Sequence, residues 1–215
     1  MTRAVPRIRS CALAALLLAV AFAANAQNIA AGERKYGICA SCHGIEGRSF
    51  KAHYPILAGQ DARYLFEQLK DFKQGLRHDP SMDAVVAGLA VPDMLDLAAF
   101  FASRKPPLGS DLPRKTGPRA PAATAACSTC HFEQSGRRQR IRGAPRILGQ
   151  HRDYLLKQLR DFRDGRRTNG SGAMRLVTRD MSDPEMNQAA AYFTRQREIH
   201  AGIAVDDTGS ASRPN

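Results

Sequence analysis

The sequence predicts an all-α protein built from two tandem copies of one small domain. Residues 54–75 and 144–165 align at an offset of 90, and ten positions from Pro55 onward are identical in the two segments. The apolar residues of each segment recur with the period of one helix face, and no stretch rich in valine or isoleucine alternates as a strand would. Because a helical unit of this size buries little apolar surface, we expect each copy to need an additional staple.

The chain begins with a segment that we expect to be removed. It has 215 residues and a formal net charge of +12, and residues 1–10 contain arginines but no acid. An apolar run to about residue 23 follows, and then Ala24, Asn25 and Ala26. This order is typical of a secretory signal peptide covering residues 1–26. A membrane anchor is the alternative, but a spanning helix needs roughly 20 apolar residues. We therefore expect export to the periplasm.

The two copies also predict the domain boundaries. We expect a first domain at residues 27–103 and a second at 123–203, joined by a linker at 104–122 that is rich in proline, glycine and basic residues. Residues 204–215 have no apolar period and are expected to form a disordered tail.

Helix signals recur in both copies. Asp61 is placed to cap a helix that ends near Gly75, and a matching helix is expected in the second copy. The final helices are expected at about residues 92–103 and 183–196. The second of these begins with a capping box of Ser182 and Glu185, for which the first copy has no counterpart.

Each copy contains one Cys-x-x-Cys-His box, namely Cys39, Cys42 and His43 in the first copy and Cys127, Cys130 and His131 in the second. Two thiols three positions apart can add to the two vinyl groups of one haem, and the adjacent histidine is placed to ligate its iron. A thioredoxin-like redox pair expects a βαβ setting, and a zinc site expects a fourth ligand at finger spacing. A disulfide across each box is a third alternative. The duplicated box favours two covalently bound haem c groups.

One methionine in each copy is the candidate sixth ligand of iron. Met82 and Met174 lie at equivalent places, 39 residues after His43 and 43 residues after His131. A thioether is soft and uncharged, so it favours Fe(II) and raises the reduction potential, which suits an electron carrier.

Other side chains could take that position. Ordinary core packing is the alternative for any helical methionine, and it fits Met94 and Met186 inside the final helices. Met181 is the nearest competitor in the second copy. Three further histidines do not recur in register, namely His53, His78 and His151.

The order of these motifs resembles a known family. The box, P-x-L-A-G-Q, Y-L-x-x-Q-L-x-x-F-x-x-G, a ligand methionine and a final helix occur twice over about residues 28–200. This pattern is similar to that of the diheme class I cytochromes c of the c-four family. The resemblance implies two tandem class I cytochrome c domains, each wrapped around one haem c, with His/Met coordination and periplasmic electron transfer. It also implies that the carbonyls of Pro55 and Pro145 accept a hydrogen bond from the proximal histidine.

Charge divides the chain into unlike halves. Residues 27–103 contain eight basic and nine acidic residues, whereas residues 123–200 contain fifteen and eight. Five arginines fall in one short run without an acid, namely Arg137, Arg138, Arg140, Arg142 and Arg146. Such asymmetry indicates orientation toward a charged partner, with a merely solvated face as the alternative. Export and the lack of a binding motif argue against nucleic acid.

The sequence therefore predicts an electron carrier and not an enzyme, because a closed His/Met shell leaves no open position on iron. The expected partners are redox proteins with an acidic docking face, such as a terminal oxidase, a quinol-cytochrome c reductase or a dehydrogenase, with peripheral contact to a membrane. The alternatives are the cytochrome subunit of a dehydrogenase, for example a flavocytochrome sulfide oxidoreductase, and a diheme peroxidase.

Overall fold

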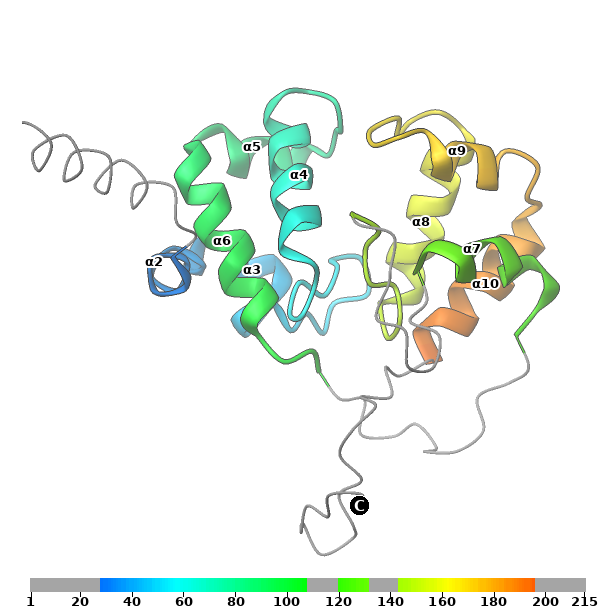
Figure 1. Cartoon of the computed structure of the whole chain (residues 1–215), viewed down its shortest axis with the longest axis horizontal. Coiled ribbons are helices and arrows are strands. Elements are labelled where there is room, and N and C mark those ends of the chain that lie inside the picture. Colours follow the sequence, from blue (N-terminus) through cyan, green and yellow to red (C-terminus); the bar gives the residue numbers. More distant parts are fainter. Residues whose placement is uncertain (1–27, 108–119, 132–142, 196–215) are drawn as a thin grey trace, which may run out of the picture.

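The computed structural model describes residues 28–107, 120–131 and 143–195, which form two groups of helices (Figure 1). The first group contains α2 (Ile29–Lys35), α3 (Gly37–His43), the 3₁₀ turn η1 (Ile45–Gly47), α4 (Ala62–Lys73), α5 (Pro80–Ala87) and α6 (Val91–Ser103). The second contains the 3₁₀ turn η2 (Ala122–Thr124), α7 (Ala125–His131), α8 (Arg152–Arg163), α9 (Ala173–Thr178) and α10 (Asp183–Arg195). The described ranges contain no strand, so the all-α prediction is confirmed. The expected signal peptide, most of the linker and the expected tail lie outside them.

The central helix of each group begins and ends as the sequence indicates. The carboxylate of Asp61 accepts the backbone N–H of Tyr64 at 2.8 Å, which caps α4. Gly75 follows α4 with φ +69°, a conformation that suits glycine best. Gly165 repeats this ending after α8 with φ +72°. His151 precedes α8 without capping it through its side chain.

The capping box expected at α10 is present. The N–H of Ser182 donates to the Glu185 carboxylate at 2.8 Å, and the N–H of Glu185 donates to the Ser182 hydroxyl at 3.4 Å. The first domain was expected to have no capping box at the start of α6, and this expectation is wrong for one of the two hydrogen bonds of the box. The carboxylate of Asp93 accepts the N–H of Ala90 at 2.8 Å, although Ala90 has no oxygen to return the bond. An acid three residues into the helix is sufficient for that half of the motif.

The core of the first domain forms where α6 crosses α2 and α4. Gly32 allows α2 to come close, because a Cβ there would lie 2.2 Å from the carbonyl oxygen of Asp96. Phe100 is fully buried at this crossing, and the ring of Tyr36 stacks on it with centroids 4.8 Å apart. In the second domain α10 packs against α8, and the 3₁₀ turn η2 contacts α10 where α2 contacts α6 in the first domain. Among the described residues, the second domain therefore has the smaller N-terminal cover.

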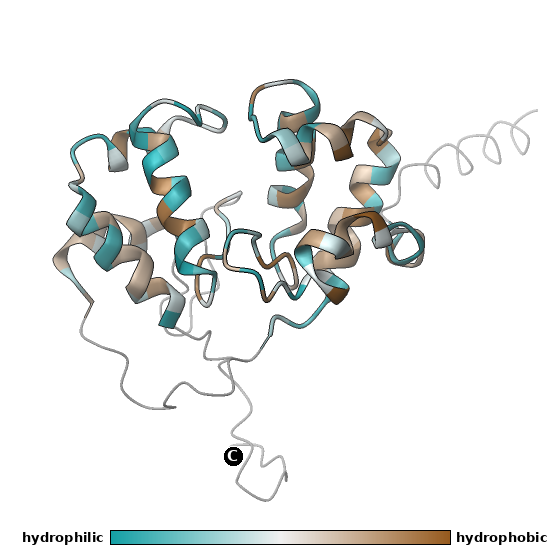
Figure 2. Cartoon of the chain, turned by 180° about the vertical axis from the view of Figure 1, so that it is seen from behind, coloured by the Kyte–Doolittle hydropathy of each residue, from teal (hydrophilic) through white to brown (hydrophobic). Residues whose placement is uncertain are grey.

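Hydropathy follows this arrangement. Figure 2 shows helices banded with apolar and hydrophilic residues, as expected of helices with one face toward a core. Within the described residues no single helix is long and apolar enough to cross a membrane. The pair α5 and α6 has the combined length and composition, but its two helices differ in direction by 119°.

Two buried glutamines join the domains. Gln60 accepts the N–H of Arg146 at 2.7 Å and donates to the carbonyl of the same residue at 2.9 Å. Gln150 accepts the N–H of Ile56 at 2.9 Å and donates to its carbonyl at 3.0 Å. Ile56 and Arg146 are themselves equivalent at the offset of 90. The contacts are therefore reciprocal, as in the self-complementary interface of a two-fold dimer.

Candidate haem-binding sites

The first box forms the last turn of α3, which brings Cys39, Cys42 and His43 to one end of that helix. His43 is buried, and its Nδ1–H donates to the carbonyl of Pro55 at 2.9 Å. This bond fixes the tautomer and leaves Nε2 as the nitrogen with a free lone pair, which is the form that binds a metal. The hydrogen bond that the family resemblance implies between His43 and the Pro55 carbonyl is therefore present.

The second box repeats this geometry on α7. His131 is buried, and its Nδ1–H donates to the carbonyl of Pro145 at 2.8 Å. The sequence separation is 14 residues here and 12 in the first domain. The same contact therefore forms although the second copy has two more residues between the histidine and the proline.

Burial sets the protonation of both boxes before any group is attached. Burial lowers the pKa of His43, and the positive charge of Arg77 lowers it further, while the Pro55 hydrogen bond and Asp79 oppose these effects. The imidazole is thus kept in its neutral, ligating form. Burial also raises the pKa of the Cys39 thiol to about 11 and raises that of Cys127. All four box cysteines are free thiols, as attachment to vinyl groups requires.

Met82 lies on α5, which the capping carboxylate of Asp79 and the first-turn residue Pro80 fix in place. Its partly buried side chain packs against the same core cluster as Cys39. The thioether and one cysteine of the box therefore border the same apolar cluster, and His43 follows that box on α3. This donor set fits haem iron, which takes one histidine and one methionine in cytochromes of high potential.

The second domain contains two methionines that compete for this position. Met181 packs against the second core cluster, whereas Met174 stands partly buried in the first turn of α9. At the offset of 92 that relates Met82 to Met174, Met181 corresponds to Leu89. Leu89 is a buried residue of the first core. By the repeat, Met181 is therefore equivalent to a core residue, and Met174 stays the predicted ligand, although Met181 packs against the second core cluster as Met82 packs against the first.

The other competitors have different surroundings. Met94 and Met186 are fully buried in α6 and α10, which fits the expected core packing. His78 is an exposed residue whose Nδ1 lies 3.7 Å from the carboxylate of Asp83. His151 donates from Nε2 to the carbonyl of Ser49 at 2.9 Å, across the domain junction.

The residues that join the domains near these sites are not predicted from the sequence. Gln60 and Gln150 belong to the repeated P-x-L-A-G-Q-type segment, and Arg77 and Arg167 follow the repeated segments without forming a motif. Both pairs recur at the offset of 90. A polar residue that recurs within an otherwise apolar repeat was the available signal.

Comparisons with known proteins agree with this geometry. The family model described as cytochrome c matches residues 29–104, which is the first domain. Cytochrome c4 of Pseudomonas aeruginosa is 35% identical over 178 residues, covering 78% of this chain and 88% of that protein. The crystal structure of reduced recombinant cytochrome c4 from Pseudomonas stutzeri superposes with a TM-score of 0.67 and 30% identity, covering 80% of this chain and 100% of that chain.

A relative named for a partner is also similar. The thiosulfate dehydrogenase electron acceptor of Stutzerimonas stutzeri is 32% identical over 179 residues, covering 76% of this chain and 81% of that protein. The two tandem boxes, the repeated proximal hydrogen bond and these similarities lead to one conclusion. The chain belongs to the cytochrome c4 family, the diheme electron-transfer cytochromes with two class I domains and two covalently bound haem c groups.

Proposed function

We propose that this chain is a freely diffusing periplasmic carrier in which His43 and Met82 ligate one iron and His131 and Met174 ligate the other. The observation that carries the proposal is the matched pair of buried histidines, each oriented by a hydrogen bond from Nδ1 to a proline carbonyl. We also propose that Cys39 and Cys42 hold the first haem and that Cys127 and Cys130 hold the second. The proposed boundaries remain residues 27–103 and 123–203, after removal of residues 1–26.

The residues of the first site each have a defined role toward a bound haem. When bound, haem iron cycles between Fe(III) and Fe(II) and so accepts and releases one electron. The Pro55 carbonyl holds the ring of His43 in one orientation and increases its basicity. The Met82 thioether stabilises Fe(II) over Fe(III), and the apolar core beside it excludes water and favours the less charged state. Because a histidine and a methionine would both hold the iron of a bound haem, substrates would have no route to it.

We further propose that the donor is a dehydrogenase acting on a reduced sulfur compound, because two similar proteins are named thiosulfate dehydrogenase electron acceptors. A carrier that receives electrons from such an enzyme would pass them toward a terminal oxidase. The rival functions are the cytochrome subunit of a dehydrogenase, which requires a permanent partner, and a diheme peroxidase, which requires an accessible iron.

The carrier function predicts no reaction of the oxidised protein with substrates on its own. We expect the ferric diheme protein mixed with thiosulfate or sulfide to stay oxidised on the timescale on which a dehydrogenase reduces it, and the ferrous protein not to consume hydrogen peroxide catalytically. The measurement is haem absorbance in a stopped-flow instrument, with and without purified thiosulfate dehydrogenase. Rapid substrate-dependent reduction without the dehydrogenase, or peroxide turnover, would exclude a simple carrier.

The arginine run needs a correction before it is assigned to docking. Arg146 faces the first domain, because its Nη2 donates to the carbonyl of Ala58 at 3.3 Å and its backbone pairs with Gln60. Arg146 was expected to belong to the docking face with the other arginines of the run. As the last arginine of the run, it lies instead at the junction between the two domains. The four remaining arginines of the run lie outside the described residues, and we propose that they attract an acidic partner.

This proposal predicts a salt-dependent rate of electron exchange. Replacing Arg137, Arg138, Arg140 and Arg142 with glutamine should slow exchange at low salt far more than at high salt. Exposed charges are screened over about 8 Å at physiological ionic strength and act mainly on the encounter rate. Stopped-flow rates with thiosulfate dehydrogenase across a salt series give the slope. If the variant keeps the wild-type slope, the run is only a solvated face.

A further inference from the structure

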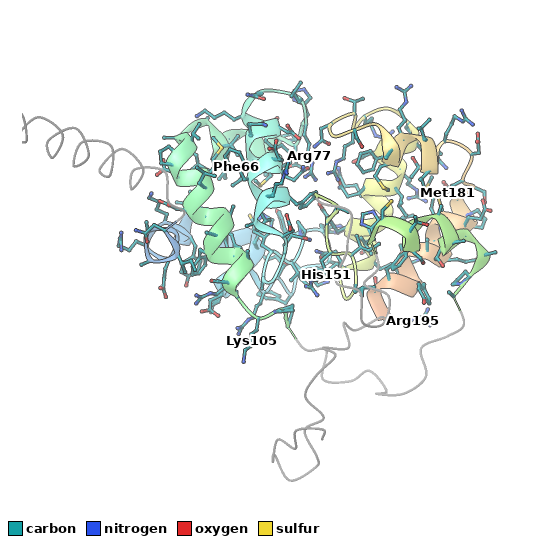
Figure 3. The ribbon with its side chains drawn as sticks, in the orientation of Figure 1. Phe66, Arg77, Lys105, His151, Met181 and Arg195 are labelled. Atoms are coloured by element: carbon teal, nitrogen blue, oxygen red, sulfur yellow. The ribbon has the colours of Figure 1, made fainter. Side chains whose placement is uncertain are left out.

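The last residue of each central helix is a cation that reaches the segment behind the candidate methionine ligand. Lys73 ends α4, and its ammonium group donates to the carbonyl of Leu89 at 2.5 Å, two residues beyond the end of α5. Arg163 ends α8, and its Nη1 donates to the carbonyl of Met181 at 3.4 Å, between α9 and α10. Figure 3 shows Met181 among the helices of the second domain. Each of these contacts therefore stays within one domain.

The two contacts are equivalent, although they join parts of the repeat that have different offsets. Lys73 and Arg163 are 90 residues apart, whereas Leu89 and Met181 are 92 residues apart. The second copy therefore has two additional residues between its central helix and the segment behind its candidate ligand. The stretch that enters the ligand helix differs between the copies, while the contact that follows this helix is kept. The recurrence points to a role for the contact itself.

Lys73 also holds the end of the ligand helix. Its ammonium group donates to the carbonyls of Ala87 at 3.2 Å and Val86 at 3.4 Å, which are the last two residues of α5. The final carbonyls of a helix have no partner within it, and a cation beside them is favourable. Val86 is 1% exposed and lies one turn after Met82 on the same helix face. An anchor at its carbonyl therefore holds the turn that carries Met82.

Both ligand helices are too short to be stable by themselves. Helix α5 has eight residues and α9 has six, whereas isolated helices shorter than roughly 12–15 residues are marginal in water. Their positions therefore depend on contacts with the rest of the domain. The carboxylate of Asp79 caps the start of α5, but Gly172 at the start of α9 makes no side-chain hydrogen bond. The contact from Arg163 consequently carries a larger share in the second domain.

We propose that Lys73 and Arg163 are positioning residues for the methionine ligands, because each cation holds the segment behind the ligand helix of its own domain. The inference rests on the proposed ligation by Met82 and Met174. A thioether can leave iron only if its helix moves away, and elements held by few contacts open locally at a lower free energy than the whole domain. Loss of the cation should make this opening easier while the axial ligands stay the same.

The test is the competition between imidazole and the thioether in the ferric full-length holoprotein. Imidazole binds Fe(III) through a ring nitrogen only after the methionine has left, so its affinity measures the opening. K73M keeps the aliphatic stem of the lysine but loses its donors. Imidazole should then bind the first haem roughly tenfold more tightly, the size expected for hydrogen bonds from a charged donor. R163M should have a larger effect at the second haem, because α9 lacks a side-chain cap.

The methionine-to-iron charge-transfer band allows the titration of one haem at a time. In a Met174→Ala background the remaining band belongs to Met82, so K73M is titrated there. In a Met82→Ala background the remaining band belongs to Met174, so R163M is titrated there. Intact mass establishes first that both haems are attached. If the two backgrounds lose no band, the proposed ligands are wrong, and this result is distinct from a failure of the two cations.

Two neighbouring cations provide matched controls. Lys70 and Arg160 lie in the last turns of α4 and α8, and they are also related by the offset of 90. Lys70 pairs with Glu67, and Arg160 pairs with Asp183, which is also a partner of Arg163. K70M and R160M therefore remove a charge from the same helix ends without removing the contact. Imidazole should bind both variants as it binds the wild type.

Exchange of the two cations tests the contact directly. Because a lysine makes it in the first domain and an arginine in the second, K73R and R163K should keep the wild-type affinity for imidazole. The proposal is overturned if K73M and R163M bind imidazole no more tightly than K70M and R160M do. It is also overturned if K73R and R163K bind imidazole as tightly as the methionine variants, because the missing donor would then not be the cause.

Discussion

Replacing Cys127 and Cys130 with alanine should yield an exported chain with one covalent haem and a largely unfolded second domain. In the part of the chain that the structure describes, the domain has a small core cluster and only the 3₁₀ turn η2 as N-terminal cover before α7. Domains of this size are marginal without a staple. Intact mass under denaturing conditions gives the haem count, and protease digestion followed by mass analysis shows which domain is cut.

The matched control is Cys11→Ala, which removes the one cysteine of the sequence that lies outside the two boxes. Because this residue lies in the expected signal peptide, both haems should remain. The equivalent Cys39 and Cys42 double variant should lose the other haem. A double variant that keeps both haems, or a wild-type chain that carries none, would contradict the attachment sites.

Met82→Ala and Met174→Ala should each lower one reduction potential and abolish about half of the methionine-to-iron charge-transfer absorption. Removal of the thioether takes away the ligand that favours Fe(II), and water or a nearby side chain then binds Fe(III) better. The expected drop is on the order of 0.1 V, within the roughly 0.8 V span over which axial ligands set haem potentials. Spectroelectrochemical titration resolves the two one-electron steps.

Met181→Ala is the decisive comparison in the second domain. Because Met181 occupies the core position of Leu89, its loss should lower stability while both potentials and the charge-transfer band persist. If Met181→Ala removes the band and Met174→Ala leaves it intact, the two methionines have been assigned in the wrong order.

The sequence alone was sufficient to predict those features of the fold and the site that depend on residues close together in the chain. The repeat and its helical period predicted the all-α class, and the family resemblance implied that the carbonyls of Pro55 and Pro145 orient His43 and His131. Asp61 and Glu185 were identified as capping residues because capping acts over three residues. Asp93 was missed because a capping box was sought as a pair, whereas this acid acts alone.

Contacts between the domains could not be predicted in the same way. The partners of Gln60 and Arg77 lie more than 75 residues away in sequence, and they depend on how two finished domains are oriented. For the same reason Arg146 was assigned to a docking face although it pairs with the first domain. A repeat shows which residues are equivalent, but it does not show that two equivalent residues meet.

The reciprocal junction has a consequence for the direction of electron flow. In a true dimer, identical halves would make the two haems equal, and an electron would have no thermodynamic reason to prefer either. A single chain removes that constraint. Asp61 caps its own helix, whereas the equivalent His151 reaches across to Ser49. Each such departure from symmetry makes the surroundings of the two sites unequal, and unequal surroundings give an electron a thermodynamic preference for one of the two haems.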